Sequence, residues 1–149
     1  MTNKIKIQIK KLHPNAIIPK YQSDGASGCD VHALLESPLT IAPQQTVLIP
    51  TGLSVAIPYG FEIQGRPRSG LSLKTPLRIS NAPGTIDSDY RGQLMVIVTN
   101  TSIDSSQIVN PGDRICQLVV CPVFQAIFEE VETLDDTKRG AGGFGSTGT

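Results

Sequence analysis

The 149-residue sequence contains no tryptophan, few aromatic residues (5%) and no excess of charge, with 13 basic and 13 acidic side chains. A chain without net charge has no overall field that would attract nucleic acid, so we expect no nucleic-acid binding. No apolar run approaches ~18 residues, so we expect no membrane span. No charged-then-apolar leader opens the chain either, so we expect no secretion.

Cysteine and histidine are also scarce. The three cysteines, Cys29, Cys116 and Cys121, have no metal-ligand spacing. An odd number of cysteines favours reduced thiols in a cytoplasmic protein. His13 and His32 each stand without a neighbouring partner that would indicate a ligand pair. The sequence therefore predicts no metal site at either histidine.

Proline and glycine, by contrast, are frequent. Eleven prolines and fourteen glycines leave almost no window for a long helix, although one helical turn fits residues 69–74. Between them lie short apolar runs that predict strands, at residues 4–10, 29–35, 39–42, 46–49, 53–57, 61–64, 94–98, 107–109, 114–123 and 124–131. This pattern is typical of an antiparallel, jelly-roll-like sandwich or barrel. We expect a single all-β domain over 1–138, with a glycine-rich tail over 139–149 that is flexible unless a ligand or neighbour holds it.

Residues 81–100 form the most informative stretch. Pro83 and Gly84 predict a turn, and residues 94–98 form an apolar run typical of a strand. Between the two lie more polar or amphipathic side chains than a plain hairpin needs, namely Asp87, Asp89, Tyr90 and Arg91. From the residues alone, the cluster fits either a functional site or a turn stabilised by local hydrogen bonds.

Arginine in glycine-containing polar segments suggests a local anion site, because its planar fork of donors suits phosphate or carboxylate. Five of the six arginines lie in such segments: Arg66, Arg68, Arg91, Arg114 and Arg139. At 68–70 an Arg-Ser-Gly sequence opens the expected helical turn, which fits an anion site or a capped turn with solvated arginines.

Three further polar positions have two interpretations each. Asp30, which enters a predicted strand, fits a site or a turn-capping residue. Gln117 lies inside an apolar run, where it needs a hydrogen-bond partner or faces outward from a half-exposed strand. The tail carries Gly140-x-Gly142-x-x-Gly145, but no helix can follow it, so it is no dinucleotide fingerprint. It fits a disordered tail or a flexible lid.

Taken in order, these segments resemble the five motifs of the homotrimeric dUTPases (deoxyuridine triphosphate nucleotidohydrolases). The first segment is Ser27-Gly28-Cys29-Asp30-Val31-His32-Ala33. The four most specific segments are Pro67-Arg68-Ser69-Gly70-Leu71, Gly84-Thr85-Ile86-Asp87-Ser88-Asp89-Tyr90-Arg91-Gly92, Gly112-Asp113-Arg114-Ile115-Cys116-Gln117-Leu118 and Arg139-Gly140-Ala141-Gly142-Gly143-Phe144-Gly145-Ser146-Thr147. The resemblance implies a jelly-roll β-barrel, a homotrimer with sites between subunits, and hydrolysis of dUTP to dUMP and pyrophosphate. That reaction limits uracil incorporation into DNA and supplies dUMP. The resemblance also implies Mg²⁺ held mainly by the triphosphate and water, without direct protein ligands.

The resemblance also implies a role for individual residues. The catalytic pair is Asp87, as general base towards water, and Gln117, which hydrogen-bonds that water or the α-phosphate. The phosphate-binding residues are Arg68, Ser69, Gly70, Arg139, Gly145, Ser146 and Thr147. The residues for base and sugar are Asn81, Gly84, Thr85, Ile86, Tyr90 and Phe144, with Asp30 in support. Asp89 and Arg91 are expected to give structural support or subunit contacts. Two departures from the family pattern are Cys29, where an aromatic residue or Leu is common, and Thr75-Pro76, where His-Gly is frequent.

Three alternatives compete with this interpretation. A dCTP deaminase of the same fold needs a glutamate-bearing signature, but the glutamates lie outside the motif positions. A catalytically idle nucleotide-binding regulator would not need Asp87, Gln117 and Arg139 together. A structural jelly roll of capsid or carbohydrate-binding kind would explain the strands, but neither the Arg-Ser-Gly turn nor the tail.

Overall fold

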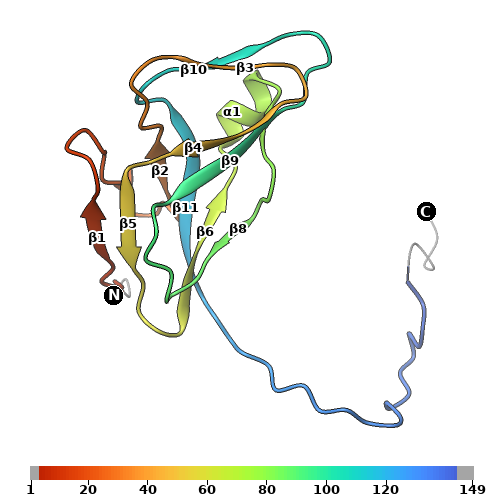
Figure 1. Ribbon diagram of the computed structural model, residues 1–149. Helices are drawn as coiled ribbons and strands as arrows, with labels where there is room; N and C mark the ends of the chain where they lie inside the picture. Colours follow the sequence, from red (N-terminus) through yellow and green to blue (C-terminus); the bar gives the residue numbers. More distant parts are fainter. Residues whose placement is uncertain (1–3, 144–149) are drawn as a thin grey trace.

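The computed structural model describes residues 4–143 (Figure 1). In this range the chain forms strands and one short helix, as the sequence predicts. Their bounds are β1 Gln8–Lys11, β2 Gly28–His32, β3 Leu39–Ile41, β4 Thr46–Pro50, β5 Leu53–Ala56, β6 Phe61–Arg66, α1 Ser69–Lys74, β7 Leu77–Ile79, β8 Gly84–Ile86, β9 Met95–Asn100, β10 Gln107–Val109 and β11 Arg114–Pro122. Helix α1 and strand β10 have the predicted bounds. Within residues 4–143, no helix is long and apolar enough to cross a membrane.

Two larger sheets face each other across the core. One has the strand order β2-β11-β6-β8 and the other β4-β9-β7, and every strand pair in them is antiparallel. Their inner faces supply the buried core, for example Val31, Ile63 and Leu118 from the first sheet and Ile49, Val96 and Val98 from the second. Two small pairs, β1-β5 and β10-β3, complete the jelly-roll-like fold, which does not close into one continuous barrel within residues 4–143.

Strands β7 and β8 are not among the strands predicted from the sequence. Each has only three residues. Strand β8 is also preceded directly by Pro83, and the sequence predicts only a turn there. The turn is present over residues 80–83, and β8 starts at its end.

The turn at Pro83 and Gly84 and the apolar run at 94–98 suggest a hairpin within residues 81–100, and that prediction is wrong. Strand β8 pairs with β6, whereas β9 pairs with β4 and β7 in the other sheet. The segment 87–94 therefore crosses from one sheet to the other. Strand β5 holds this segment, because Ser54 Oγ donates to Arg91 O (2.7 Å) and Leu94 N donates to Leu53 O (2.7 Å).

The strand expected over residues 124–131 is also wrong for the single chain. After β11 the chain runs away from the body, as the blue segment in Figure 1 shows, and residues 123–143 contain no strand. Phe124, Ile127 and Phe128 are 94%, 97% and 95% exposed. A strand needs a hydrogen-bonded partner, and the described part of this chain offers the segment none.

Candidate active site

A carboxylate with two arginines lies at one end of the first sheet. Asp30 on β2 accepts a hydrogen bond from Arg68 Nε (2.8 Å) and one from Arg114 Nη1 (3.2 Å). The pair with Arg68 is largely buried, with 21% and 18% of the two side chains exposed. Arg68 also donates to Arg114 O (3.0 Å). Two cations on one carboxylate leave a net positive charge, which suits an anionic ligand.

Gln117 lies next to this cluster. It pairs directly with Asp30 between β11 and β2, so both side chains project from the same face of the sheet. Its Nε2 donates to Pro67 O (2.8 Å) in the turn that precedes α1. The side chain thus faces outward, is half-buried, and has the hydrogen-bond partner that its place in an apolar strand requires.

The turn into α1 brings Ser69 and Gly70 to the surface beside Arg68. Arg68 is the N-cap residue of the helix, in an extended conformation, and no side chain caps the helix there. No acidic residue lies in the first turn either. The turn therefore leaves backbone donors uncompensated on the side where Arg68 adds positive charge.

A second group of predicted residues surrounds two adjoining cavities. The outer cavity, of about 230 Å³, is lined by Leu48, Asn81, Thr85, Ile86, Asp87, Tyr90, Gln93, Leu94, Met95 and Ile97. The inner cavity, of about 80 Å³, shares Asn81, Thr85 and Ile86 with it and adds Gly84. Most residues expected to contact base and sugar, together with Asp87, therefore meet around one hollow.

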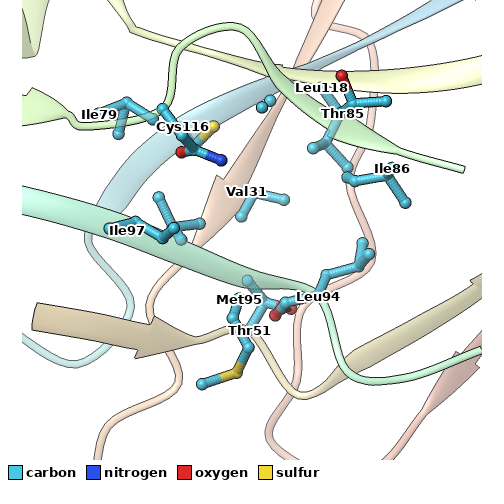
Figure 2. Close-up of a pocket in the computed structure, with 14 residues that line it drawn as sticks. Val31, Thr51, Ile79, Thr85, Ile86, Leu94, Met95, Ile97, Cys116 and Leu118 are labelled. Atoms are coloured by element: carbon cyan, nitrogen blue, oxygen red, sulfur yellow. Dashed lines mark hydrogen bonds between the residues drawn. The ribbon is translucent and has the colours of Figure 1, made fainter. Parts of the chain in front are cut away.

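Figure 2 shows how the inner cavity is built from both sheets. Thr85 and Ile86 come from β8, Met95 and Ile97 from β9, and Cys116 and Leu118 from β11. Sequence reasoning missed Gln93, Met95 and Ile97. Met95 and Ile97 are two residues apart on β9, so strand alternation places them on one face, but the sequence does not tell which face meets the cavity.

Two local contacts shape the polar rim of the outer cavity. The Tyr90 hydroxyl donates to Gln93 O (2.9 Å). Asn81 reaches over the start of β8, because a Cβ placed on Gly84 would lie 3.0 Å from Asn81 Nδ2. The carboxylate of Asp87 is exposed at the same rim.

The two groups of residues do not meet within one chain. Gln117 lies opposite Arg66 of β6, and Gly84 lies opposite Gly65 on the other side of the same strand. Strand β6 therefore lies between β11, which carries Gln117, and β8, which carries Gly84. The two outer strands are two strand spacings, about 10 Å, apart. Across residues 4–143 no hydrogen bond or ion pair joins Asp87 to Asp30, Arg68 or Gln117.

Of the tail residues predicted to belong to the site, only Arg139 lies within the described range. Its Nε donates to Gly142 O (2.8 Å), and Gly140 N donates to Thr137 O (3.0 Å), so this part of the tail forms a local turn. The predicted residues Phe144, Gly145, Ser146 and Thr147 lie outside the described residues.

The thiols and the histidine near the carboxylate have shifted pKa values. Burial raises the pKa of Cys116 to about 11, and burial together with nearby Asp30 raises the pKa of Cys29. Both thiols thus stay protonated at neutral pH, which argues against a thiolate nucleophile. Burial lowers the pKa of His32.

In the described part of the chain, no three His, Cys, Asp or Glu side chains gather in a way that could hold a metal ion.

An arginine-bearing turn and a cavity with a polar rim define a class: an all-β protein that takes a small, anionic ligand. A family model described as dUTPase matches residues 14–148. The chain is 53% identical over 143 residues to the deoxyuridine 5'-triphosphate nucleotidohydrolase of Picosynechococcus sp., covering 96% of this chain and 99% of that protein. It is 52% identical over 146 residues to the enzyme of the same name from Bdellovibrio bacteriovorus, covering 97% of each chain. The chain belongs to the dUTPase family.

Solved structures agree with this family. The dUTPase of Staphylococcus bacteriophage 80alpha with dUpNHpp superposes with a TM-score of 0.85 at 28% identity, covering 99% of this chain and 100% of that one. A mutant dUTPase from phage phi11 of S. aureus, described with a structural Mg(II) ion, has a TM-score of 0.80 at 26% identity and covers 88% of this chain and 99% of its own. The all-β, jelly-roll-like fold predicted from the sequence is confirmed.

Proposed function

This member of the dUTPase family hydrolyses dUTP to dUMP and pyrophosphate, and we propose that Asp87 is the general base of the reaction. The observation that carries the proposal is the outer cavity, where Asp87 shares one rim with Asn81, Thr85 and Tyr90. The reaction removes dUTP, which limits uracil incorporation into DNA, and supplies dUMP for thymidylate synthesis.

The position of Asp87 suits a general base. Its side chain is exposed at the mouth of the cavity, where it can accept a proton from water as that water attacks the α-phosphorus. Gln117 hydrogen-bonds the attacking water or the α-phosphate. Its carboxamide is already fixed by the bond to Pro67 O, so little side-chain freedom is lost when substrate binds.

The phosphates bind at the positive cluster. Arg68 keeps its second terminal nitrogen for a ligand while Nε is held by Asp30, and the backbone of Ser69 and Gly70 adds donors. From the tail, Arg139 acts as an arginine finger on the γ-phosphate, with Gly145, Ser146 and Thr147 beside it. Such fixed positive groups stabilise charge that develops on the phosphates in the transition state.

Selectivity for deoxyuridine comes from the cavity. Asn81 and the backbone of residues 84–86 present donors and acceptors to the Watson–Crick edge of uracil. Cytosine reverses that pattern at position 4 and would leave buried polar groups unpaired, which is a strong basis for discrimination. Tyr90 packs on the deoxyribose and leaves no room for a 2′-hydroxyl, and Phe144 covers the base when the tail closes.

The site residues fit a Mg²⁺ ion that would be held by the triphosphate rather than by protein side chains. Both oxygens of Asp30 are engaged by arginines, and within residues 4–143 no three His, Cys, Asp or Glu side chains gather in a way that could hold a metal ion. Such a site fits Mg²⁺ that is held by triphosphate oxygens and water, as this ion often is. Bound in that way, Mg²⁺ supplies positive charge that neutralises the phosphates. The protein then has only to orient the nucleotide and activate the water.

The working unit is a homotrimer with sites shared between subunits. Two observations support this assembly: Asp87 and the Arg68–Gln117 group do not meet within one chain, and the segment 123–143 leaves the body with its large apolar side chains exposed. In the trimer, Asp87 of one subunit faces Arg68 and Gln117 of another, and residues 139–149 close over a site as a lid. The folded unit is then 1–138.

The three unpaired cysteines suit the reducing cytoplasm, where we place this activity.

The decisive experiment measures pyrophosphate released from dUTP with Mg²⁺ by the native protein and by Asp87→Asn. Because Asp87 is exposed, the variant should keep its melting temperature and lose at least about 100-fold in kcat. A variant that hydrolyses dUTP at the native rate would contradict the role of Asp87. Ammonia released from dCTP would instead indicate a deaminase, and nucleotide binding without turnover a regulator.

Shared sites are tested by mixing two inactive variants. Asp87→Asn and Arg68→Ala trimers, unfolded together and refolded at equal amounts, should regain activity, because about a quarter of the sites then combine an intact Asp87 with an intact Arg68. Light scattering gives the oligomeric state. No recovery in refolded mixed trimers would contradict sharing of the site between subunits.

A further inference from the structure

Gly28, the first residue of β2, lies directly against the side chain of Gln117. A Cβ placed on Gly28 would lie 2.5 Å from Gln117 Oε1 and 3.3 Å from its Cδ. Carbon–oxygen contacts in proteins are normally about 3.3 Å or longer. No side chain therefore fits at position 28 while Gln117 keeps its observed conformation.

The carboxamide of Gln117 is held from its other end as well. Its Nε2 donates to Pro67 O (2.8 Å), while its Oε1 points at Gly28. The group thus lies between the start of β2 and the turn that carries Arg68. Its orientation depends on one hydrogen bond and on the empty space above Gly28.

The backbone gives no separate reason for glycine at this position. Gly28 lacks the positive φ found at Gly52, Gly60, Gly112 and Gly140, and glycine within a strand generally weakens it. We propose that Gly28 is a positioning residue, whose missing side chain leaves the space in which the Gln117 carboxamide is held for catalysis. This inference rests on the proposed function, in which Gln117 contacts the water or the α-phosphate.

An alanine at position 28 should change the site without unfolding the protein. The atom that it would strike is the free end of a flexible side chain, and Val119 Cγ2, at 3.4 Å, is in ordinary contact. Rotation of Gln117 relieves the clash and breaks its bond to Pro67 O. The strand itself accepts alanine, which also reduces the conformational entropy of the unfolded chain.

The first test compares Gly28→Ala with Gly25→Ala. Gly25 lies three residues earlier, in the loop before β2, and a Cβ placed there meets nothing within 4 Å. We expect Gly28→Ala to lower kcat for dUTP about 10- to 100-fold, as a small misplacement of a reacting group does, with an unchanged melting temperature and a KM within about two-fold. Gly25→Ala should match the native enzyme. Full kcat in Gly28→Ala would overturn the proposal.

The second test separates positioning from a general structural effect. In a Gln117→Ala background no carboxamide remains to be displaced, so adding Gly28→Ala should cause no further loss of kcat. An equal loss in both backgrounds would overturn the proposal.

A third measurement does not depend on activity. The side-chain amide resonances of Gln117, assigned by their absence in Gln117→Ala, should shift in Gly28→Ala and stay in place in Gly25→Ala. Unmoved resonances in Gly28→Ala would overturn the positioning role. Native activity in Gln117→Ala alone would instead refute the catalytic role of Gln117, so the two failures are distinguishable.

Discussion

The ring of Tyr90 folds back onto Gly92, and the contact exists only because Gly92 has no side chain. A Cβ on Gly92 would lie 2.4 Å from the Tyr90 hydroxyl oxygen and 2.5 Å from Cζ. The hydroxyl then reaches Gln93 O at 2.9 Å. The ring is thereby fixed at the rim of the outer cavity, where deoxyribose is proposed to lie.

Gly92→Ala should therefore weaken selection of the sugar. The methyl group pushes the Tyr90 ring from its place, and Gly92 has no positive φ that would make alanine strained. We expect KM for dUTP to rise about 10-fold, which corresponds to ~1.4 kcal/mol, and the preference for dUTP over UTP to fall. Measured kcat/KM values for both nucleotides check this. In a Tyr90→Ala background the substitution should have no effect, and an equal effect there would contradict the argument.

Asp30→Asn should loosen the positive cluster. The substitution keeps the shape of the side chain but removes the charge that Arg68 and Arg114 share. Because the pair with Arg68 is largely buried, we expect the free energy of unfolding to fall by about 1–3 kcal/mol and KM for dUTP to rise. Urea unfolding and steady-state kinetics measure the two effects. Asp24→Asn, in the exposed loop before β2, is the control and should change stability by less than about 0.5 kcal/mol.

Asn100→Ala should destabilise the fold without affecting the site. Asn100 is fully buried, and its Nδ2 donates to Ile41 O (3.0 Å) and to Ser105 O (2.8 Å). Its Oδ1 accepts from Ser102 N (3.0 Å). Alanine leaves these buried groups without partners, which should cost about 2–4 kcal/mol in denaturant unfolding. The exposed Asn15→Ala is the control, and a loss below about 1 kcal/mol at Asn100 would contradict this account.

The sequence predicts the local features of this fold well. Prolines and glycines bound short apolar runs, so helix α1 and strand β10 are predicted with their observed bounds. Residues from Asn81 to Tyr90 are close together in sequence, so their gathering around one cavity follows from a single motif.

Features that depend on non-local pairing could not be predicted. Segment 87–94 resembles a hairpin until β8 and β9 are seen to pair in different sheets. The hydrogen bond between Arg114 and Asp30 was not predicted. The position of Arg114 opposite β2 depends on a shift of strand register between Arg114 and Cys116, and a sequence does not show such a shift. The exposed segment 123–143 forms no strand, because no strand of the described residues pairs with it.

His32 should make the free energy of unfolding depend on pH. Its Nδ1 is buried without a hydrogen-bond partner in the described residues, and burial lowers its pKa below 6.5 despite nearby Asp30, while Arg114 and Arg68 lower it further. Below pH 6.5 the unfolded chain thus binds a proton that the folded chain resists, so the free energy of unfolding falls as pH drops from 6.5 towards the folded-state pKa. His32→Gln should flatten this slope in unfolding measured between pH 7.5 and 5. His13→Gln, in an exposed turn, should not.

Deleting residues 139–149 should separate folding from catalysis. The last strand, β11, ends at Pro122, and the large apolar side chains exposed after it, such as Phe124 and Phe128, lie before Lys138. We expect these side chains to contact a neighbouring subunit, so the shortened chain should stay a folded trimer by light scattering. It loses Arg139 and the residues proposed to hold the γ-phosphate, and an arginine finger contributes about 10³ or more to kcat. Pyrophosphate release should therefore fall by a comparable factor. Removal of only Gly148 and Thr149 is the matched control and should leave the rate unchanged. A fully active 1–138 chain would refute the lid, whereas a monomer would assign the tail to assembly.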